Sequence, residues 1–495
     1  MILAFLALLA TAQDEVEDRE DDMFGGSEDS DDSDDDSNRE DDMFGGDTDE
    51  GGREDDLFGQ SLEPQSTTAA DLLAKIEDAD DNFQIGGSLW LRMQGAVADK
   101  KFSGPDDIAL TSPNLLTLFA DARPNDRVRA YVRGRLQHDW TVIESDDAAA
   151  EDLLFGAAEQ NTVLLDQMWI KFDVKQSLFT TIGRQRVKWG AGRFWNPTDF
   201  VNQQRLDPLA IQDLRIGVSA VKLHLPIESA GANFYALANL DEATALDEIG
   251  GAFRGEIVFG QTEFTVSSAL RKNNPVRIGA DVSSGVSILD VRVEGAVIHG
   301  DESLYWRGQL DPPNLAFPSE RDRSDDWIPQ VVAGVEFSAR YSDQDNISFG
   351  AEYFYNDAGY SNSRLYPWMF FTGSYTPFYV GRHYLAAYSM LAGPGRWDDH
   401  SFTASYITNL SDSSNVARLD YRGNVLTWLD VNAFYSMNFG GNGEFHYRLK
   451  MDPVPEFALP LLDDTELEPY KDVLAEKILV PAPLATFGLG ASVRF

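Results

Sequence analysis

The sequence of 495 residues predicts an all-β protein. The fold class is a transmembrane, antiparallel, up-and-down β-barrel of about 18 strands, with 16 as the alternative count, behind a disordered acidic N-terminal extension. Three observations predict it. Apolar and polar residues alternate from Phe83 to the C-terminus, the connections between alternating segments tend to be long and short in turn, and no segment after the first twelve residues has 18 consecutive apolar residues. The last observation excludes a helical membrane protein.

The first twelve residues are typical of a signal peptide. An apolar core ends in the small-residue site Ala10-Thr11-Ala12, and cleavage before Gln13 would release an exported chain. The alternative is an ordinary buried helix, but the acidic segment that follows could not cover such a helix. Residues 1–12 are therefore expected to be removed.

Residues 13–66 form a very acidic segment. Between Asp14 and Gln60 there are 23 acidic residues and three arginines, so this stretch holds −20 of the formal net charge of −42. Such a segment cannot bury enough apolar surface to offset its ordering entropy, which predicts disorder. The charge also argues against nucleic acid as a partner, because phosphate would be repelled. The absence of cysteine excludes disulfides, cysteine-ligated metal centres and a cysteine nucleophile.

One motif, Arg-Glu-Asp-Asp-Met/Leu-Phe-Gly, occurs three times in this segment, at residues 19–26, 39–46 and 53–59. Each copy keeps an apolar pair inside a charged frame, which is typical of a docking peptide whose acidic flanks steer it to a basic partner. Three copies would add avidity. The alternatives are drift of a repeat in a solvating tail and loose Ca²⁺ binding by the aspartates. The docking hypothesis expects a periplasmic or envelope partner and assigns the anchors to Phe24, Phe44 and Phe58.

Residues 67–82 predict a short helix or linker between the acidic segment and the body of the protein. Leu72, Leu73 and Ile76 would share one face of such a helix. It would either plug a pore mouth or only join the two parts.

From Phe83 the alternation has the period of two that defines a strand. Residues 83–98 place apolar side chains on one face and polar or amphipathic ones on the other. Residues 126–137 place four arginines on one face, which do not fit a dry core but do fit the wet side of a pore wall. Eighteen such segments are predicted: 83–98, 113–122, 126–137, 162–174, 178–189, 214–225, 232–240, 251–260, 262–271, 276–284, 286–299, 328–341, 346–356, 381–392, 400–410, 415–422, 425–438 and 485–495.

The connections between these segments support a barrel. Outer-membrane barrels have short turns at one rim and long loops at the other. Residues 99–112, 140–161 and 190–213 are long, and the connections that alternate with them are short. Two expected loops, 272–275 and 411–414, are short instead. An even strand count places both ends of residues 83–495 at the same rim, the periplasmic one for an exported chain.

The last eleven residues alternate strictly and end in an aromatic residue. They resemble the final strand of bacterial outer-membrane β-barrels. A soluble β-sandwich or solenoid would also alternate, but it would need neither apolar residues outside nor arginines inside. The resemblance implies the outer membrane of a Gram-negative-type bacterium, contact with its lipid, and recognition by the barrel-assembly machinery through Phe487, Leu489, Val493 and Phe495.

One wall of the predicted lumen is basic, because three neighbouring strands bring basic residues to alternate positions. Later strands place carboxylates such as Glu294, Glu336 and Glu352 on the less apolar face. A field between the two walls would filter solutes by charge. The alternative is that these charges pair and only stiffen the wall. The lumen and selectivity residues are expected to be Arg127, Arg129, Arg133, Arg135, Lys171, Arg184, Arg186 and Lys188.

The segment that follows the basic strand contains Gly190, Gly192 and Asn196-Pro197, which favour a sharp bend and a turn. It falls at the third outer loop and resembles the third loop of general porins, which folds inward and narrows the channel. The Gly-Arg-Gln…Trp-Gly run is similar to segments of 18-stranded barrels of the alginate-export and porin-like groups. This second resemblance implies passage of a polar, anionic solute or a polysaccharide along the arginines. The resemblance to general porins implies a constriction formed by Arg193, Trp195, Asn196, Asp199, Arg205 and Asp207. The alternative is a loop that only packs in the mouth.

Together these features predict a porin-like outer-membrane channel for diffusion of small polar solutes, anionic ones among them, through a charged lumen. The acidic tail is expected in the periplasm. The alternative is a structural or assembly barrel whose tail docks a periplasmic or envelope partner, and the third hypothesis is a polysaccharide export channel. The spacing of the six histidines does not form a helical zinc pair, and no nucleophile elbow, phosphate loop or dinucleotide fingerprint occurs. We therefore expect no enzymatic activity, cofactor or metal.

Overall fold

The computed structural model describes residues 82–98, 108–142, 159–202, 204–301, 303–342, 345–462, 471–475 and 477–495. The predicted signal peptide, the acidic segment with Phe24, Phe44 and Phe58, and all but the last residue of the linker lie outside the described residues. None of the helices in the described part of the chain combines the length and the apolar character needed to cross a membrane.

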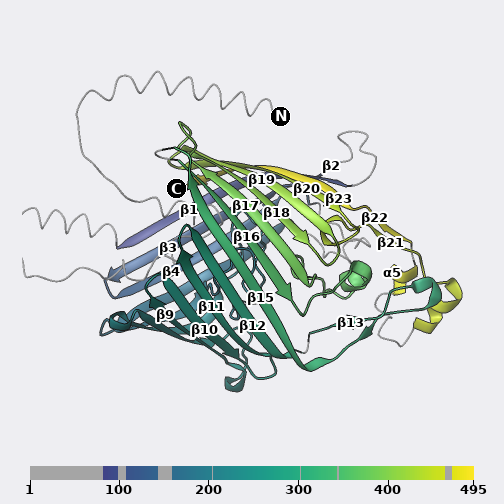
Figure 1. The fold of residues 1–495 in the computed structure, drawn as a ribbon, viewed down its shortest axis with the longest axis horizontal. Coiled ribbons are helices and arrows are strands. Elements are labelled where there is room, and N and C mark those ends of the chain that lie inside the picture. The colour runs from purple at the N-terminus through teal and green to yellow at the C-terminus, as the bar shows by residue number, and fades with distance from the viewer. Residues whose placement is uncertain are drawn as a thin grey trace, which may run out of the picture.

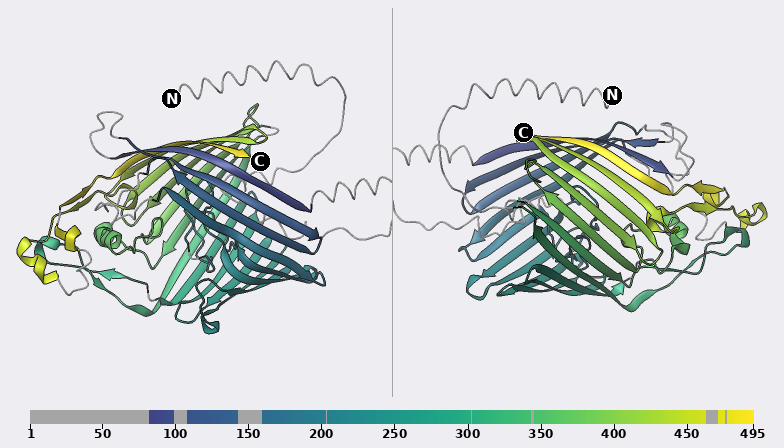
Figure 2. Two further views of the ribbon diagram at one scale, coloured as in Figure 1. Left: turned by 180° about the vertical axis from the view of Figure 1, so that it is seen from behind. Right: turned by 45° about the horizontal axis from the view of Figure 1, so that its top comes forward.

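A single antiparallel sheet closes on itself into a barrel (Figures 1 and 2). The sheet has 19 strands, of which the short β2 (Ile108–Thr111) pairs with β1 in the same register as β3 and only continues that strand, and the other 18 form the closed circuit. Each of these strands pairs with the next one, and the circuit closes where β1 pairs with β23. The expected fold class is confirmed. The barrel strands are β1 (Phe83–Ala98), β3 (Pro113–Asn125), β4 (Val128–Asp139), β5 (Asn161–Val174), β6 (Leu178–Gln185), β7 (Val218–Ile227), β8 (Ala232–Asn239), β9 (Gly250–Phe259), β10 (Thr262–Leu270), β11 (Val276–Val286), β12 (Leu289–Asp301), β15 (Arg323–Arg340), β16 (Asn346–Asn356), β17 (His383–Ala392), β18 (His400–Asn409), β19 (Ser414–Leu426), β20 (Leu429–Gly440) and β23 (Pro483–Arg494).

The two rims of the barrel differ in their connections. Both ends of the barrel chain lie at one rim, which we call the terminal rim, because the backbone N–H of Gly87 donates to the carbonyl of Phe495 at 2.8 Å. Connections at this rim are short, such as the two residues between β3 and β4. The opposite rim, the loop rim, has the long connections, except for the short loops between β10 and β11 and between β18 and β19, as predicted.

Residues that alternate along each strand lie in turn on the outer face of the barrel and on the face toward the lumen. On β1, Leu89, Leu91 and Met93 lie on the outer face with 37–40% of their surface exposed. Trp90, between them, faces the lumen and is 4% exposed. Exposed apolar side chains on every barrel strand except β16, whose outer side chains are half-buried, form a belt, whereas soluble proteins rarely expose such contiguous apolar surface. The belt is the surface that lipid would cover.

Several strand boundaries differ from the prediction by a few residues, and the two beside the connection from β6 to β7 affect the site. β6 ends at Gln185 rather than 189, and β7 begins at Val218 rather than 214. The alternation past Gln185 is real, but Val187 and Trp189 are buried because the chain turns into the lumen and packs over β7 to β9. A loop segment with alternate residues buried therefore has the same sequence period as a strand.

Short elements gather at the loop rim, where the connections before β15, β17 and β23 form a cap with its own apolar core around Trp368, Leu449 and Leu474. Near the loop rim are η5 (Leu246–Glu248), β13 (Trp306–Arg307), η6 (Pro312–Asn314), β14 (Ser319–Glu320), η7 (Ser363–Leu365), α4 (Tyr366–Phe371), η8 (Glu444–His446), β21 (Leu449–Met451), η9 (Glu456–Leu462), α5 (Lys471–Ala475) and β22 (Ile478–Val480), and at the terminal rim η4 (Glu228–Ala230).

Candidate functional site in the barrel lumen

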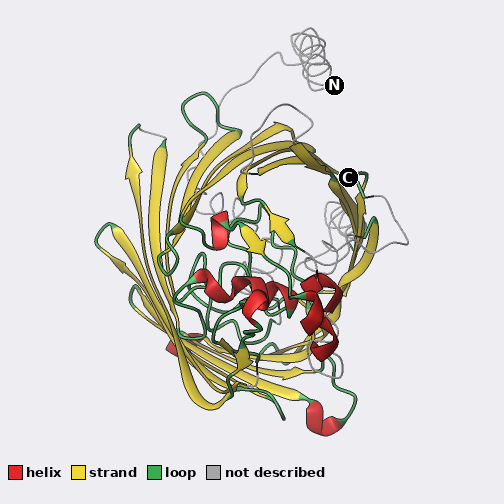
Figure 3. Cartoon of the chain, turned by 90° about the vertical axis from the view of Figure 1, so that its right-hand side faces the viewer, coloured by secondary structure: helices red, strands yellow, loops and turns green. Residues whose placement is uncertain are grey.

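The connection between β6 and β7 folds into the barrel rather than over its rim. Figure 3 looks into the ring of strands from the loop rim and shows loops and short helices across its interior. In this inward loop (residues 186–217), Phe194 and Trp195 are 1% and 0% exposed. The Trp195 ring stacks on Phe354 of β16 at 5.4 Å between centroids and lies 5.5 Å from Tyr384 of β17. The loop thus reaches the wall opposite to its own strands.

A carboxylate on that opposite wall holds the tip of the inward loop. Glu352 of β16 accepts hydrogen bonds from the main-chain N–H groups of Arg193 at 2.7 Å, Phe194 at 3.0 Å and Trp195 at 2.9 Å. Three consecutive amides that converge on one carboxylate form an anion-binding nest. Glu352 is 4% exposed, so the nest compensates the burial of its charge.

A second carboxylate holds the base of the same bend. Glu294 of β12 accepts hydrogen bonds from the N–H groups of Ala191 at 2.8 Å and Gly192 at 3.1 Å, and from both the N–H and the hydroxyl of Thr198 at 2.7 and 2.8 Å. A side chain at Gly192 would not fit, because its Cβ would lie 2.0 Å from the carbonyl oxygen of Trp195. Gly190 has φ of +100°, a conformation that L side chains rarely adopt. The two predicted glycines therefore form the bend.

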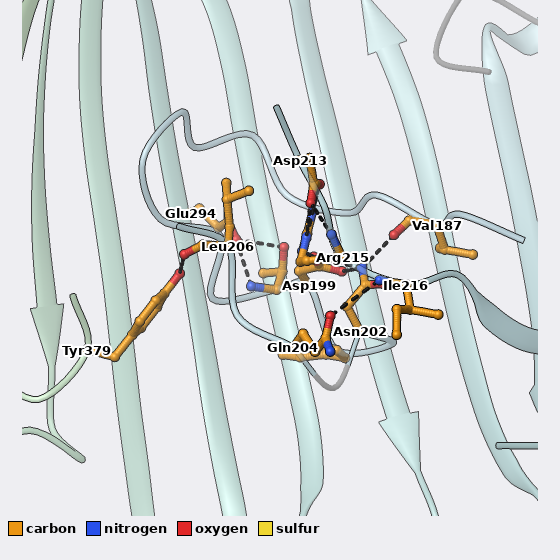
Figure 4. A network of polar contacts seen from close by, with 12 residues as sticks. Val187, Asp199, Asn202, Gln204, Leu206, Asp213, Arg215, Ile216, Glu294 and Tyr379 are labelled. Carbon is orange, nitrogen blue, oxygen red and sulfur yellow. Dashed lines mark hydrogen bonds and ion pairs between the residues drawn. The ribbon is translucent and has the colours of Figure 1, made fainter. Parts of the chain in front are cut away.

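Arg215 ties the middle of the inward loop to its C-terminal part (Figure 4). Its guanidinium binds Asp213 through Nε and Nη2 and reaches Asp199 at 2.7 Å. Asn202 donates to the same Asp199 carboxylate at 2.7 Å. Burial acts to raise the pKa of Asp213, but the hydrogen bonds and charge of Arg215 outweigh it and lower that pKa. The pair of Arg215 and Asp213 is therefore charged at neutral pH, whereas burial raises the pKa of Asp199.

Three arginines share one aspartate on the wall near the inward loop. Asp166 is fully buried and lies 3.0 Å from Arg135, 3.0 Å from Arg186 and 3.7 Å from Arg133. The register between β4 and β5 skips Asp166, so it occupies a β-bulge. The bulge turns this side chain inward between the outward Leu165 and Met168. The three guanidinium groups outnumber the carboxylate that they share, so this group has a net positive charge.

The inward loop leaves a cavity of about 660 Å³ on its terminal-rim side. The roof of the cavity is residues 208–214 of the inward loop, and the walls are the terminal-rim halves of β1, β3, β4, β18, β19, β20 and β23. We call it the terminal cavity. Its charged lining residues are Arg133, Arg135, Arg186, Arg422, Arg494, Asp213, Asp420 and Asp430.

The structure brings part of the predicted selectivity set together in the lumen. Arg129, Arg133 and Arg135 lie on the inner face of β4, and Lys171 on β5 is directly opposite Arg129. Arg129 pairs with Asp121 at 3.0 Å. The inner face of β4 is thus a basic strip whose members also have acidic neighbours.

Three of the predicted residues lie elsewhere. Arg184 is on the outer face, because its direct partner on β5 is Met168, which is 52% exposed. The placement of Arg184 in the lumen was wrong, because Arg184 shares the outer face with Ile182, and Arg186 turns inward only after β6 has ended at Gln185. Arg127 is exposed in the turn before β4, and Lys188 is exposed beyond the end of β6.

The six residues expected at a constriction divide into two groups. Trp195, Asn196 and Asp199 are 0–8% exposed and anchor the inward loop, so they do not face an open passage. Arg193 reaches Glu336 at 3.2 Å and Tyr388 at 2.6 Å, and is also used for anchoring. Arg205 and Asp207 are exposed, and the Arg205 guanidinium lies 5.3 Å from the ring centre of Tyr379.

The predicted acidic wall exists but is covered. Glu294, Glu336 and Glu352 lie on the lumen face, and main-chain amides or arginines of the inward loop engage all three. These carboxylates therefore hold the loop and do not face the basic strip across open water.

The C-terminal strand has the predicted orientation. Phe487, Leu489 and Phe495 are exposed on the outside by 37–66%, and Val493 shares their alternation on β23. The role of these residues in assembly stays a prediction.

Two features were missed in the sequence. The bulge at Asp166 shifts the apolar phase of β5 from Val163 and Leu165 to Met168 and Ile170, a shift that is visible in the sequence. The main-chain N–H groups that bind Glu294 and Glu352 leave no such signal, because almost every residue type has a main-chain N–H group.

No family model matches the chain. No curated protein matches it either. Among solved structures the chain is similar to a BenF-like porin from Pseudomonas fluorescens Pf-5, with 11% identity over 84% of this chain and 99% of that one and a TM-score of 0.49. It is also similar to OccAB3 of Acinetobacter baumannii (10% identity, 84% and 99% covered, TM-score 0.47) and to OccK9 (OpdG) of Pseudomonas aeruginosa (10%, 84% and 98%, TM-score 0.48). At such identities and TM-scores, the function of this chain has to be inferred from its own residues.

Proposed function

We propose that this protein is an outer-membrane channel through which small polar solutes diffuse, with the terminal rim in the periplasm. The observation that carries the proposal is the combination of a closed circuit of strands, an apolar outer belt and an interior cavity of about 660 Å³ lined by charged side chains. Backbone groups in lipid need internal partners, and only closure supplies them to strands. A polar interior inside such a closed wall supports passage rather than storage of a cofactor.

The inward loop supports a selective rather than a wide pore. Its two carboxylate anchors and the Arg215 ion pair hold residues 186–217 across the lumen, and solutes would pass beside residues 208–214. The passage then runs along Arg133 and Arg186, whose side chains are 18% and 21% exposed. A net positive strip in a narrow, low-dielectric passage raises the local concentration of anions.

The test is conductance of the purified full chain in a planar bilayer with a panel of salts and organic anions. We expect steady current with a preference for anions. Arg133→Gln combined with Arg186→Gln should shift the reversal potential in a salt gradient toward cations. Arg184→Gln is the matched control, because it removes the same charge from the outer face and should leave the reversal potential unchanged.

Absence of current from a correctly folded barrel would contradict the channel and favour the structural or assembly barrel. A reversal potential that ignored Arg133 and Arg186 would leave a channel but overturn the selectivity role.

A further inference from the structure

The terminal cavity lies where the N-terminal segment joins the barrel. Residues 1–81 connect through Asn82 to β1, whose first residues pair with the C-terminal Phe495. Gly87, Ser88, Arg494 and Phe495 all line the cavity. The acidic repeats are therefore tethered at the edge of this cavity.

The charge of the cavity is opposite to that of the repeats. Arg422 and Arg494 both approach Asp430, at 4.0 and 2.5 Å, so two guanidinium groups share one carboxylate. Their side chains remain 34% and 55% exposed. The whole lining contains five arginines and three aspartates, and Asp166 behind the lining adds a fourth carboxylate, so the cavity has a net positive charge. Each repeat has three consecutive carboxylates, as in Glu40-Asp41-Asp42.

The cavity also offers apolar surface beside its arginines. Trp90, Phe119, Tyr131, Trp428 and Phe495 line it. The ring of Trp428 is 51% exposed, whereas the side chain of Phe495 lies on the outer face at the edge of the cavity. An aromatic anchor next to basic groups matches a peptide in which Met-Phe or Leu-Phe follows the carboxylates.

We propose that the Arg-Glu-Asp-Asp-Met/Leu-Phe-Gly repeats dock in the terminal cavity of their own barrel and obstruct it. The repeat carboxylates pair with Arg422, Arg494 and the arginines around Asp166, and the repeat phenylalanine packs on the aromatic side chains. Three copies compete for one cavity, so one copy can replace another. The docking is independent of conductance, whereas its effect on current rests on the proposed channel function.

The tether makes weak docking effective. Phe58 lies 24 positions before Asn82. An unfolded chain of that length would have an end-to-end distance on the order of 30 Å. Flexible tethers of such length give effective concentrations of about 1 mM. A repeat that binds in the millimolar range in solution would then occupy the cavity for much of the time.

The experiment uses the absence of cysteine from the natural chain. In the full chain, Gly46→Cys is combined with Ser401→Cys, which lies in the cavity wall on β18. The matched control is Gly46→Cys with Ser177→Cys, which lies on the exposed turn between β5 and β6 at the same rim. Disulfide formation is followed in dilute detergent solution under mild oxidation, with the heat-modifiable gel mobility of the folded barrel as a check.

We expect the Ser401→Cys pair to cross-link at least about five-fold faster than the control at 0.1 M salt. The advantage should disappear at 1 M salt, where charges are screened within about 3 Å. It should also disappear when Phe24, Phe44 and Phe58 are all replaced by alanine, a change that leaves every barrel residue in place. Equal rates for the two pairs, or an advantage that survives the loss of the three phenylalanines, would overturn the docking.

Current gives the second readout. The triple phenylalanine-to-alanine chain should conduct at least about two-fold more than the natural chain at 0.1 M salt. If cross-linking behaves as expected while neither chain conducts, the docking stands and the channel function fails. If both chains conduct equally and cross-link only at the control rate, the channel stands and the docking fails.

Discussion

The carboxylate of Glu352 on β16 accepts a hydrogen bond of 2.9 Å from the main-chain N–H of Trp195, which lies 157 positions earlier in the chain. Two further amides of the inward loop bind the same carboxylate. The contact crosses the lumen from one wall of the barrel to the other. This contact holds the inward loop across the lumen. The width of the passage therefore depends on whether the contact is made.

Glu352→Ala should therefore widen the passage. The change leaves three buried N–H groups without an acceptor, each of which costs about 1–3 kcal/mol when buried, so the tip of the inward loop should detach. We expect larger and noisier single-channel current, and cleavage of the native protein near Arg193 by trypsin. Glu320→Ala on the exposed β14 is the control. Unchanged current and protease resistance would show that the aromatic packing of Trp195 is sufficient.

Gly192→Ala should destabilise the bend even though it adds a single methyl group. The added Cβ would lie 2.0 Å from the carbonyl oxygen of Trp195, whereas a Cβ at Gly295 on β12 would meet nothing within 4 Å. Overpacking of this kind costs about 1–3 kcal/mol. Thermal unfolding followed by heat-modifiable mobility should show a lower midpoint for Gly192→Ala than for the control Gly295→Ala. Equal midpoints would mean that the bend shifts without cost.

Asp166→Asn should change both stability and selectivity. It leaves Arg133, Arg135 and Arg186 without their shared carboxylate, and removal of one partner from a buried ion pair costs about 3–5 kcal/mol. The wall also gains one positive charge, so the anion preference in a salt gradient should increase in whatever fraction folds. Asp126→Asn in the exposed turn between β3 and β4 is the control. A shift toward cations would contradict the assignment of this group to the passage.

The strands were predictable because the two faces of each strand meet different environments, which produces an alternation of residue types with a period of two in the sequence. All eighteen predicted segments correspond to barrel strands, including those next to the two unexpectedly short loops. The period of two does not show on which face of the wall a residue lies after a β-bulge or beyond the end of a strand. Asp166 was not noticed because it occupies a bulge. Arg184 was misplaced because it was grouped with Arg186, which lies beyond the end of β6.

The candidate site was predictable only in outline. Gly190, Gly192 and Asn196-Pro197 indicated a bend that enters the lumen, and the loop does enter it. The roles of Trp195 and Asp199 differ from the expectation, because contacts with distant strands bury them against Phe354 and Arg215. Such contacts join positions far apart in the chain, and a single sequence holds no record of them.

The pH response of the loop rim should follow Glu444. Its carboxylate joins the connection before β23 to the connection before β17 and to the loop-rim ends of β17 and β18, because it accepts hydrogen bonds from the main-chain N–H of Phe378, from Tyr384 at 2.7 Å and from Asn409 at 2.9 Å. Burial, assisted by the charge of Asp412, raises the pKa of Glu444 to about 7 despite these donors. The folded state therefore binds the proton more tightly than the unfolded state, and stability is lost as pH rises from about 4.5 to about 7.

We expect the contact between these connections to be weaker by about 2 kcal/mol at pH 8.5 than at pH 5.5, since one pKa unit corresponds to about 1.4 kcal/mol. Hydrogen exchange of the amides in residues 376–382 and 441–447 measures it, with protection that is greater at the lower pH after correction for the intrinsic rate. Glu444→Gln mimics the protonated acid and should hold the protection constant between the two pH values. Glu456→Gln, at the exposed start of η9, should keep the response of the natural chain. A pH response that persists in Glu444→Gln would assign it to another group of the rim, with Asp412 the first to examine because Tyr366 and Asn409 both donate to it.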